Sequence, residues 1–139
     1  METLPLVDEH RLKIPASSEE IWVALLGVVR RDMGGGAAFA RALGCDPAQG
    51  TADFAGRPGD CVPGFRVAEA EPGRRLVLHG RHRFASYALT FVVDASQLRA
   101  RTDATFPGLL GAIYRAAVIG RGGHRLVTRR LLRRVAQAV

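Results

Sequence analysis

The chain has few of the features of disulfide-linked, metal-bound or membrane-spanning proteins. Its two cysteines, Cys45 and Cys61, form no CxxC pair and have no metal-ligand neighbours in the sequence. We therefore interpret them as reduced packing residues in a cytoplasmic protein. No apolar run approaches the roughly 20 residues that a transmembrane helix needs. The N-terminus has no basic region followed by an apolar stretch, so neither a membrane span nor a signal peptide is expected.

Motifs for common catalytic chemistries are also missing. The sequence contains no GxSxG, no P-loop, no GxGxxG after a strand and no HExxH. Its four histidines show neither HxH nor HxxxH spacing, although zinc accepts histidine ligands. We therefore expect no metal site and no cofactor. Whether the protein is an enzyme is left open at this point.

Acidic residues are absent after Asp103, where seven arginines follow. The net charge of +7 is unevenly distributed, with nine acidic and six basic residues through Asp60, and four acidic and fourteen basic residues from Cys61 onward. Lys13 is the only lysine, so GC-rich coding is an alternative explanation for the abundance of arginine. The arginine count alone therefore identifies no partner.

The first third of the sequence predicts a strand followed by two helices. Residues 9–14 alternate as a half-buried strand, with His10 on its apolar face. Ser17 and Glu20 have the spacing of a capping box, which predicts a helix beginning after Ser17. A second, short helix is predicted over residues 37–43.

Alternating apolar residues in the middle of the chain predict an antiparallel meander. The predicted strands cover residues 62–69, 76–84, 87–93 and 98–106, with a further short strand at 51–55. The connections between the longer strands are tight and contain turn residues such as Gly73 and Ser96. Consecutive strands with tight connections pair antiparallel.

From residue 109 onward the pattern is typical of one long amphipathic helix. Its apolar stripe consists of Ile113, Ala117, Gly120, His124, Val127, Leu131 and Val135. The stripe continues across the glycines, which favours one weakened helix over two helices, although each glycine costs about 1 kcal/mol in a helix interior. The predicted core combines this stripe with the earlier elements and contains Trp22, Phe65, Leu78, Leu89, Phe91, Ile113 and Val127.

Three parts of the sequence resemble a known superfamily. They are residues 14–22 (IPASSEEIW), residues 67–72 leading into 76–84, and residues 106–109 (FPGL) before the last helix. These segments are similar to the START-like, or SRPBCC, superfamily with its helix-grip fold. Polyketide cyclases, lipid-transfer domains and the birch pollen allergen family belong to it.

The resemblance implies an α+β fold in a single START-like domain over residues 1–139. In that fold an antiparallel β-sheet curves around a long C-terminal α-helix, and a short helix pair follows the first strand. The resemblance also implies that an apolar or amphipathic molecule binds between sheet and helix. Because only some members of the superfamily catalyse a reaction, the fold by itself does not imply an activity.

Histidine and tyrosine side chains on apolar faces are the candidate ligand-binding residues. The candidate set consists of His82, His124, Tyr87, Tyr114, Phe91 and His10. An imidazole in an apolar pocket is suited near neutral pH to proton transfer or to anchoring a ligand. The alternative is that each histidine is a core residue bound to the backbone and that each tyrosine has its hydroxyl at the surface. In a helix-grip arrangement, His82 and His124 are predicted to line the same pocket.

Two functions are compatible with these observations. The first is binding of a small apolar or amphipathic molecule in a cavity between sheet and C-terminal helix, alone or with acid–base chemistry of the cyclase or dehydratase type. The second is a non-catalytic module that binds nucleic acid or an anionic membrane surface through the Arg-rich C-terminal helix. That helix lacks aromatic residues for base stacking, and its macrodipole favours basic residues near its end, so a solvated face is the simpler interpretation and nucleic acid is not expected. A role as a protein-interaction domain is a further alternative, and the sequence does not decide whether the chain forms a homodimer.

Overall fold

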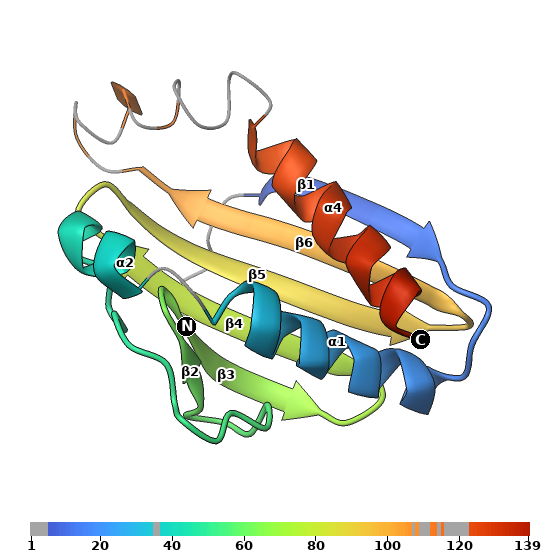
Figure 1. The fold of residues 1–139 in the computed structure, drawn as a ribbon. Coiled ribbons are helices and arrows are strands. Elements are labelled where there is room, and N and C mark those ends of the chain that lie inside the picture. Colours follow the sequence, from blue (N-terminus) through green and yellow to red (C-terminus); the bar gives the residue numbers. More distant parts are fainter. Residues whose placement is uncertain (1–5, 35–36, 107, 109–111, 114, 116–122) are drawn as a thin grey trace.

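Two long helices pack on one face of a six-stranded antiparallel sheet (Figure 1). The structure, a computed structural model, describes residues 6–34, 37–106, 108, 112–113, 115 and 123–139. Within these residues the strands are β1 (Leu6–Lys13), β2 (Cys61–Val62), β3 (Phe65–Glu71), β4 (Arg75–His82), β5 (Ala85–Asp94) and β6 (Gln97–Thr105). The helices described over the same ranges are α1 (Ser18–Asp32), α2 (Ala37–Leu43) and α4 (Gly123–Ala138).

The sheet is open rather than closed into a barrel. Its strand order is β1-β6-β5-β4-β3-β2, which places β1 and the short β2 at the edges. Every neighbouring pair is antiparallel. Helix α4 packs beside α1 on the sheet (Figure 1). The predicted α+β fold, an antiparallel sheet with a C-terminal helix packed against it and a helix pair after the first strand, is confirmed.

Tight turns fix the register of the long hairpins. Strands β5 and β6 are joined by Ala95 and Ser96, whose φ angles of 47° and 61° match the right-handed twist of the two strands. Asp94 and Gln97 therefore pair directly across the turn. Between β3 and β4, Gly73 has a φ of 77°, a left-handed conformation that glycine adopts without a steric cost. Both turns lie where the sequence predicts them.

One predicted strand is absent, and another is wrong in part. Residues 51–55 form turns, in which the backbone N–H of Phe54 donates to the carbonyl of Thr51 at 3.3 Å. The predicted strand over residues 62–69 is interrupted by a turn at Gly64, whose φ is 89°. The chain reverses there, so β2 pairs with β3 as a hairpin instead of extending it. The sequence carries a local signal for this reversal, because Pro63 and Gly64 are turn residues and Val62 is out of phase with Phe65 and Val67.

A buried carboxylate organises the irregular segment before β2. The side chain of Asp60, which is only 9% exposed, accepts hydrogen bonds from the backbone N–H groups of Ala55 at 2.9 Å and Arg57 at 3.1 Å. The bond from Ala55 is the main reason that the pKa of Asp60 lies below its usual value. Segments without regular structure need such partners for their backbone groups.

Helix α1 begins with the predicted capping box. The Ser17 hydroxyl accepts from the backbone N–H of Glu20 at 3.1 Å, and the Glu20 carboxylate accepts from the backbone N–H of Ser17 at 3.2 Å. Two backbone N–H groups of the helix start are satisfied in this way. The buried face of α1 consists of Ile21, Trp22, Ala24, Leu25, Val28 and Val29.

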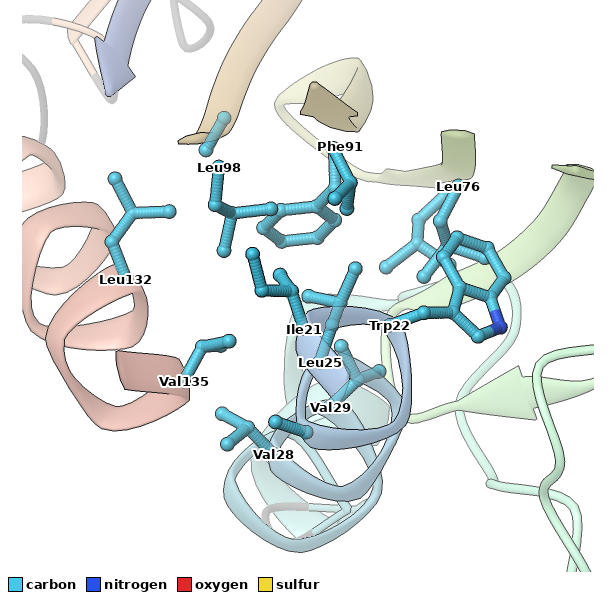
Figure 2. Close-up of a cluster of buried hydrophobic side chains, with 14 of the residues drawn as sticks. Ile21, Trp22, Leu25, Val28, Val29, Leu76, Phe91, Leu98, Leu132 and Val135 are labelled. Carbon is cyan, nitrogen blue, oxygen red and sulfur yellow. The ribbon is translucent and has the colours of Figure 1, made fainter. Parts of the chain in front are cut away.

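The hydrophobic core lies where α1 and α4 meet the inner face of the sheet. Figure 2 shows Ile21 and Leu25 of α1 next to Phe91 of β5, with Val135 of α4 closing one side. All four side chains are fully buried. Burying an aliphatic or aromatic side chain of this size contributes about 1.5–3 kcal/mol, so this cluster supplies a large part of the stability of the fold.

Four predicted core residues are confirmed, and one is only half-buried. Trp22, Leu78, Leu89 and Phe91 are at most 9% exposed. Phe65 packs against the core but keeps part of its ring accessible.

The predicted apolar stripe of the last helix is wrong at two positions. Val127 is 68% exposed and Ile113 is 57% exposed, whereas both were predicted to be buried. The inward face of α4 is formed by Thr128, Leu132 and Val135. Hydrophobicity alone selected Val127 over the neighbouring threonine, but Val127 lies on the flank of α4, where it lines an open pocket instead of packed core.

Only part of the predicted long helix can be compared with the structure. Residues Gly123–Ala138 of it form α4, while most of residues 109–122 lie outside the described residues. Among the helices that the structure describes, none combines the length and the apolar character of a membrane span.

Candidate functional site

A pocket of about 750 Å³ lies beside the core on the same face of the sheet. Its walls come from the end of β4, the beginning of β5, the end of β6 and the turn between β2 and β3. Helix α2, the end of α1 and the middle of α4 close it from above the sheet. This volume is within the range of small-molecule binding sites, about 300–1,000 Å³.

Small side chains on the sheet leave room for the pocket. Ala85 of β5 and Ala104 of β6 line it, whereas the same face further along these strands carries Phe91 and Leu98 in the packed core. The helices above the pocket also contribute a small residue, Ala40 of α2. One end of the inner face is therefore filled by side chains, and the other end remains open.

An aromatic cluster forms the wall at the strand ends. The ring centroid of Tyr87 lies 5.1 Å from that of Phe65 and 5.6 Å from that of His82. His82 also packs edge-on against Phe84, with ring centroids 5.9 Å apart. Of these four, Phe65, His82 and Tyr87 line the pocket. Such rings offer large apolar surfaces to a ligand and a few polar atoms at their edges.

The hydroxyl of Tyr87 connects this wall to the turn between β2 and β3. It donates a hydrogen bond of 2.7 Å to the carbonyl oxygen of Gly64. Gly80 of β4 lies beneath this bond, and a Cβ at Gly80 would collide with the Gly64 oxygen and with the Tyr87 ring. Glycine is therefore required at Gly80, and the phenol proton is already used in a structural hydrogen bond.

His82 is held as a neutral imidazole with a defined tautomer. The backbone N–H of Phe84 donates to Nδ1 of His82 at 3.0 Å, so Nδ1 is unprotonated and the ring proton resides on Nε2. Burial lowers the pKa of His82 below its usual value of 6.5 because it disfavours the charged ring. At neutral pH the side chain therefore carries no charge.

Three charged side chains lie together where the C-terminal end of α1 meets α4. We call this place the opening of the pocket, or the opening for short. They are Asp32, Arg130 and Arg134, all of which line the pocket. Arg134 forms a two-point ion pair with Asp32, in which Nη2 donates to Oδ1 at 3.3 Å and Nε contacts Oδ2. Arg130, one helical turn before Arg134, forms no ion pair with any residue that the structure describes.

Other polar groups in the pocket walls are uncharged. Thr102 of β6 and Thr128 of α4 contribute hydroxyls and are 7% and 4% exposed. Cys45 contributes a free thiol. The lining is otherwise largely apolar, which is typical of a pocket for small molecules with a few orienting polar groups.

The structure brings together two of the predicted site residues. His82 and Tyr87 line the pocket next to each other. Phe91 is fully buried in the core and is not among the lining residues. Tyr114 and the side chain of His124 lie outside the described part of the chain. The prediction that His82 and His124 share a pocket therefore stays a prediction.

His10 lies on β1, apart from this pocket. Its Nε2 is 3.4 Å from Oδ2 of Asp8, and the two side chains are 13% and 10% exposed. His10 does not line the pocket, although it has the inward orientation that the alternation predicts. Among the described residues, no three His, Cys, Asp or Glu side chains are grouped in a way that could hold a metal ion.

Sequence reasoning missed the charged residues of the opening. Arg130 and Arg134 were assigned to a solvated band on the last helix, yet Arg134 pairs with Asp32 and Arg130 lines the pocket. No local signal joins Asp32 to α4, because the two partners are 102 positions apart. A pairing over that distance follows from the packing of α1 against α4.

Comparison with known proteins identifies the fold and no family. No protein-family model matches the chain, and no curated protein matches it. Among solved structures, protein CV1439 from Chromobacterium violaceum matches with 16% identity and a TM-score of 0.58 over 96% of each chain. The Mll3558 protein from Rhizobium loti matches with 17% identity and a TM-score of 0.56, over 93% of this chain and 90% of that chain. Protein MLL2253 from Mesorhizobium loti matches with 13% identity and a TM-score of 0.55 over 94% of each chain.

The likeness to these three structures is one of fold alone. Identities of this size show a shared fold and carry no information about ligand or reaction. The open antiparallel sheet with its C-terminal helix agrees with the architecture that the resemblance implied. The function must be argued from the pocket itself.

Proposed function

We propose that the chain binds a small apolar or amphipathic molecule in the pocket between the sheet, α2 and α4. The observation that carries the proposal is a pocket of about 750 Å³ with largely apolar walls beside a fully packed core. Apolar walls that stay in contact with water forgo the stabilisation that packing them would give, so a space of this size is unfavourable unless it serves another purpose. Its few polar groups are placed to orient a bound molecule.

The arrangement supports binding better than acid–base catalysis. Nδ1 of His82 accepts from the backbone N–H of Phe84, so it is not available as a base. The phenol proton of Tyr87 is donated to Gly64. Asp32 lines the pocket as a carboxylate, but both of its oxygens face Arg134. We therefore restrict the proposal to binding.

Titration of isotope-labelled protein with decanol tests the proposal through amide NMR shifts. Decanol is neutral and has an apolar chain, so it reports on the apolar walls alone. We expect shifts at Ala85, Tyr87 and Ala104, which line the pocket, and none at Thr90 on the outer face of β5. Native mass spectrometry of protein purified from its own host would then identify the natural ligand.

A matched pair of variants locates the binding. Ala104→Leu places three further carbon atoms in the pocket and should weaken the binding of decanol. Thr90→Leu adds bulk on the opposite face of the neighbouring strand and should leave the binding unchanged. The proposal fails if decanol causes no shifts up to its solubility limit, or if the shifts are confined to the outer face of the sheet.

A further inference from the structure

The charges of the opening indicate which kind of ligand the pocket takes. Of the described lining residues, Asp32, Arg130 and Arg134 are the only ones charged at neutral pH. Asp32 and Arg134 neutralise each other in their two-point ion pair. Among the described lining residues one positive charge therefore remains in excess, and Arg130 carries it.

The pairing of Asp32 with Arg134 has its own structural cause. Asp32 is the last residue of α1, where the negative end of the helix dipole disfavours a carboxylate. Arg134 offsets this repulsion and connects the end of α1 to α4. The Asp32 side chain is 22% exposed and that of Arg134 is 46% exposed, so the pair lies at the border of pocket and solvent. Arg134 is thus occupied within the fold.

Arg130 has no comparable role in the fold. It is exposed, and it forms no ion pair with the described residues. Arg133 and Arg134 lie one turn further along α4, and like charges at this spacing repel each other. A negative group bound at the opening would relieve this repulsion, and it would remain close to water, which keeps its desolvation cost low.

The wall of the pocket at the strand ends is apolar. Phe65 and Tyr87 form an aromatic surface at the strand ends, and His82 beside them is neutral because burial lowers its pKa. Ala85 and Ala104 on the inner face of the sheet also line the pocket. A molecule that fits both regions has an apolar body for the inner wall and a charged group for the opening.

We propose that the pocket binds an amphipathic carboxylate, whose apolar chain lies against the sheet and whose carboxylate pairs with Arg130 at the opening. This inference rests on the proposed function and adds the chemical class of the ligand. Arginine is suited to this role because its planar guanidinium matches the two oxygens of a carboxylate. Arg129 and Arg133 on the same helix do not line the pocket and have no part in it.

Decanoate and decanol, which share one chain length and differ in the head group, separate this inference from the proposed function. Isothermal titration calorimetry at low salt should show that decanoate binds about three to ten times more tightly than decanol, the strength of a partly exposed charge-assisted contact. Arg130→Gln should remove this advantage and leave decanol binding unchanged. Arg133→Gln, on an exposed face of the same helix, is the control and should change neither affinity.

A spectroscopic measurement distinguishes direct pairing from a change of pocket shape. In carboxyl-labelled decanoate bound to the protein, the pKa of the ligand carboxyl should lie below its value in water, because a guanidinium favours the ionised form. Arg130→Gln should raise that pKa again. Raising the salt concentration should weaken the binding of decanoate and leave the binding of decanol unchanged.

The possible outcomes bear on the two proposals differently. If decanol and decanoate bind equally and Arg130→Gln affects neither, the carboxylate inference is wrong and the pocket function stands. If Arg130→Gln weakens both probes alike, Arg130 shapes the pocket and does not recognise charge, which also refutes the inference. If neither probe binds the wild-type protein, the proposed function fails and the inference fails with it.

Discussion

Two alanines on one strand, Ala100 and Ala104, test whether the pocket is open in solution. Both lie on the inner face of β6, where Ala100 pairs with Phe91 and Ala104 pairs with Tyr87. Ala100 is 0% exposed within the core, whereas Ala104 is 7% exposed and lines the pocket. Replacement by leucine adds the same three carbon atoms at both positions. The two variants therefore differ only in whether the structure provides space for those atoms.

The expected magnitudes follow from that space. In the packed core, Ala100→Leu forces its neighbours apart and should lower the free energy of unfolding by about 1–3 kcal/mol. In the pocket, the added carbons of Ala104→Leu enter free volume, where each buried methylene contributes about 0.8 kcal/mol. The loss of leucine rotamer freedom offsets about 0.5–1 kcal/mol of this gain. Ala104→Leu should therefore be no less stable than the wild type, and full burial of the three carbons would raise the free energy of unfolding by about 1–2 kcal/mol.

Urea denaturation followed by fluorescence measures the difference. Trp22 is the single tryptophan and is 8% exposed in the core, so its emission reports the loss of packing. Circular dichroism provides a second probe of the same transition, and equal slopes for all variants would show that the unfolded states are comparable. The reasoning is refuted if Ala104→Leu loses as much stability as Ala100→Leu, because the space at Ala104 would then be filled in solution.

Three further changes test individual contacts. Tyr87→Phe removes the hydrogen bond to Gly64 and should cost about 0.5–1.5 kcal/mol in urea denaturation; no loss would mean that water replaces the hydroxyl. Arg134→Gln breaks the partly exposed pair with Asp32 and should cost at most about 1 kcal/mol, whereas unfolding of the variant would contradict the assigned exposure. Because the pKa of His82 is lowered by folding, its contribution to stability is present above pH 6.5 and is lost as the pH falls through the folded-state pKa. His82→Gln should therefore flatten the stability profile between pH 7.5 and pH 5, and an unchanged profile would show that another group titrates there.

The sequence by itself determined the elements that depend on near neighbours. The capping box of Ser17 and Glu20 is a contact over three residues, and it forms as predicted. The turn at Ala95 and Ser96 and the alternation of β5 and β6 are equally local, since side chains of a strand point to opposite faces in turn. With the strands joined by tight turns, their antiparallel order followed as well. The fold class and the inward placement of His82 and Tyr87 could be predicted for this reason.

Local patterns could not separate the core from the pocket. Phe91 and Tyr87 lie on the same face of β5, yet Phe91 is packed and Tyr87 lines open space. Val127 was predicted to be buried because it is apolar, but a pocket wall and a core have the same hydrophobicity. The difference depends on what covers each position, and for β5 and β6 the cover comes from helices elsewhere in the chain.

Tertiary structure alone decided the chemistry of the opening. Asp32 and Arg134 meet across 102 positions of sequence, and their pairing leaves Arg130 as the charge that faces the pocket. In the sequence the arginines of the last helix cannot be told apart, because the sequence does not show which of them will face another element once the helix is packed. Packing of α4 beside α1 gives each arginine a different environment, and with it a different role.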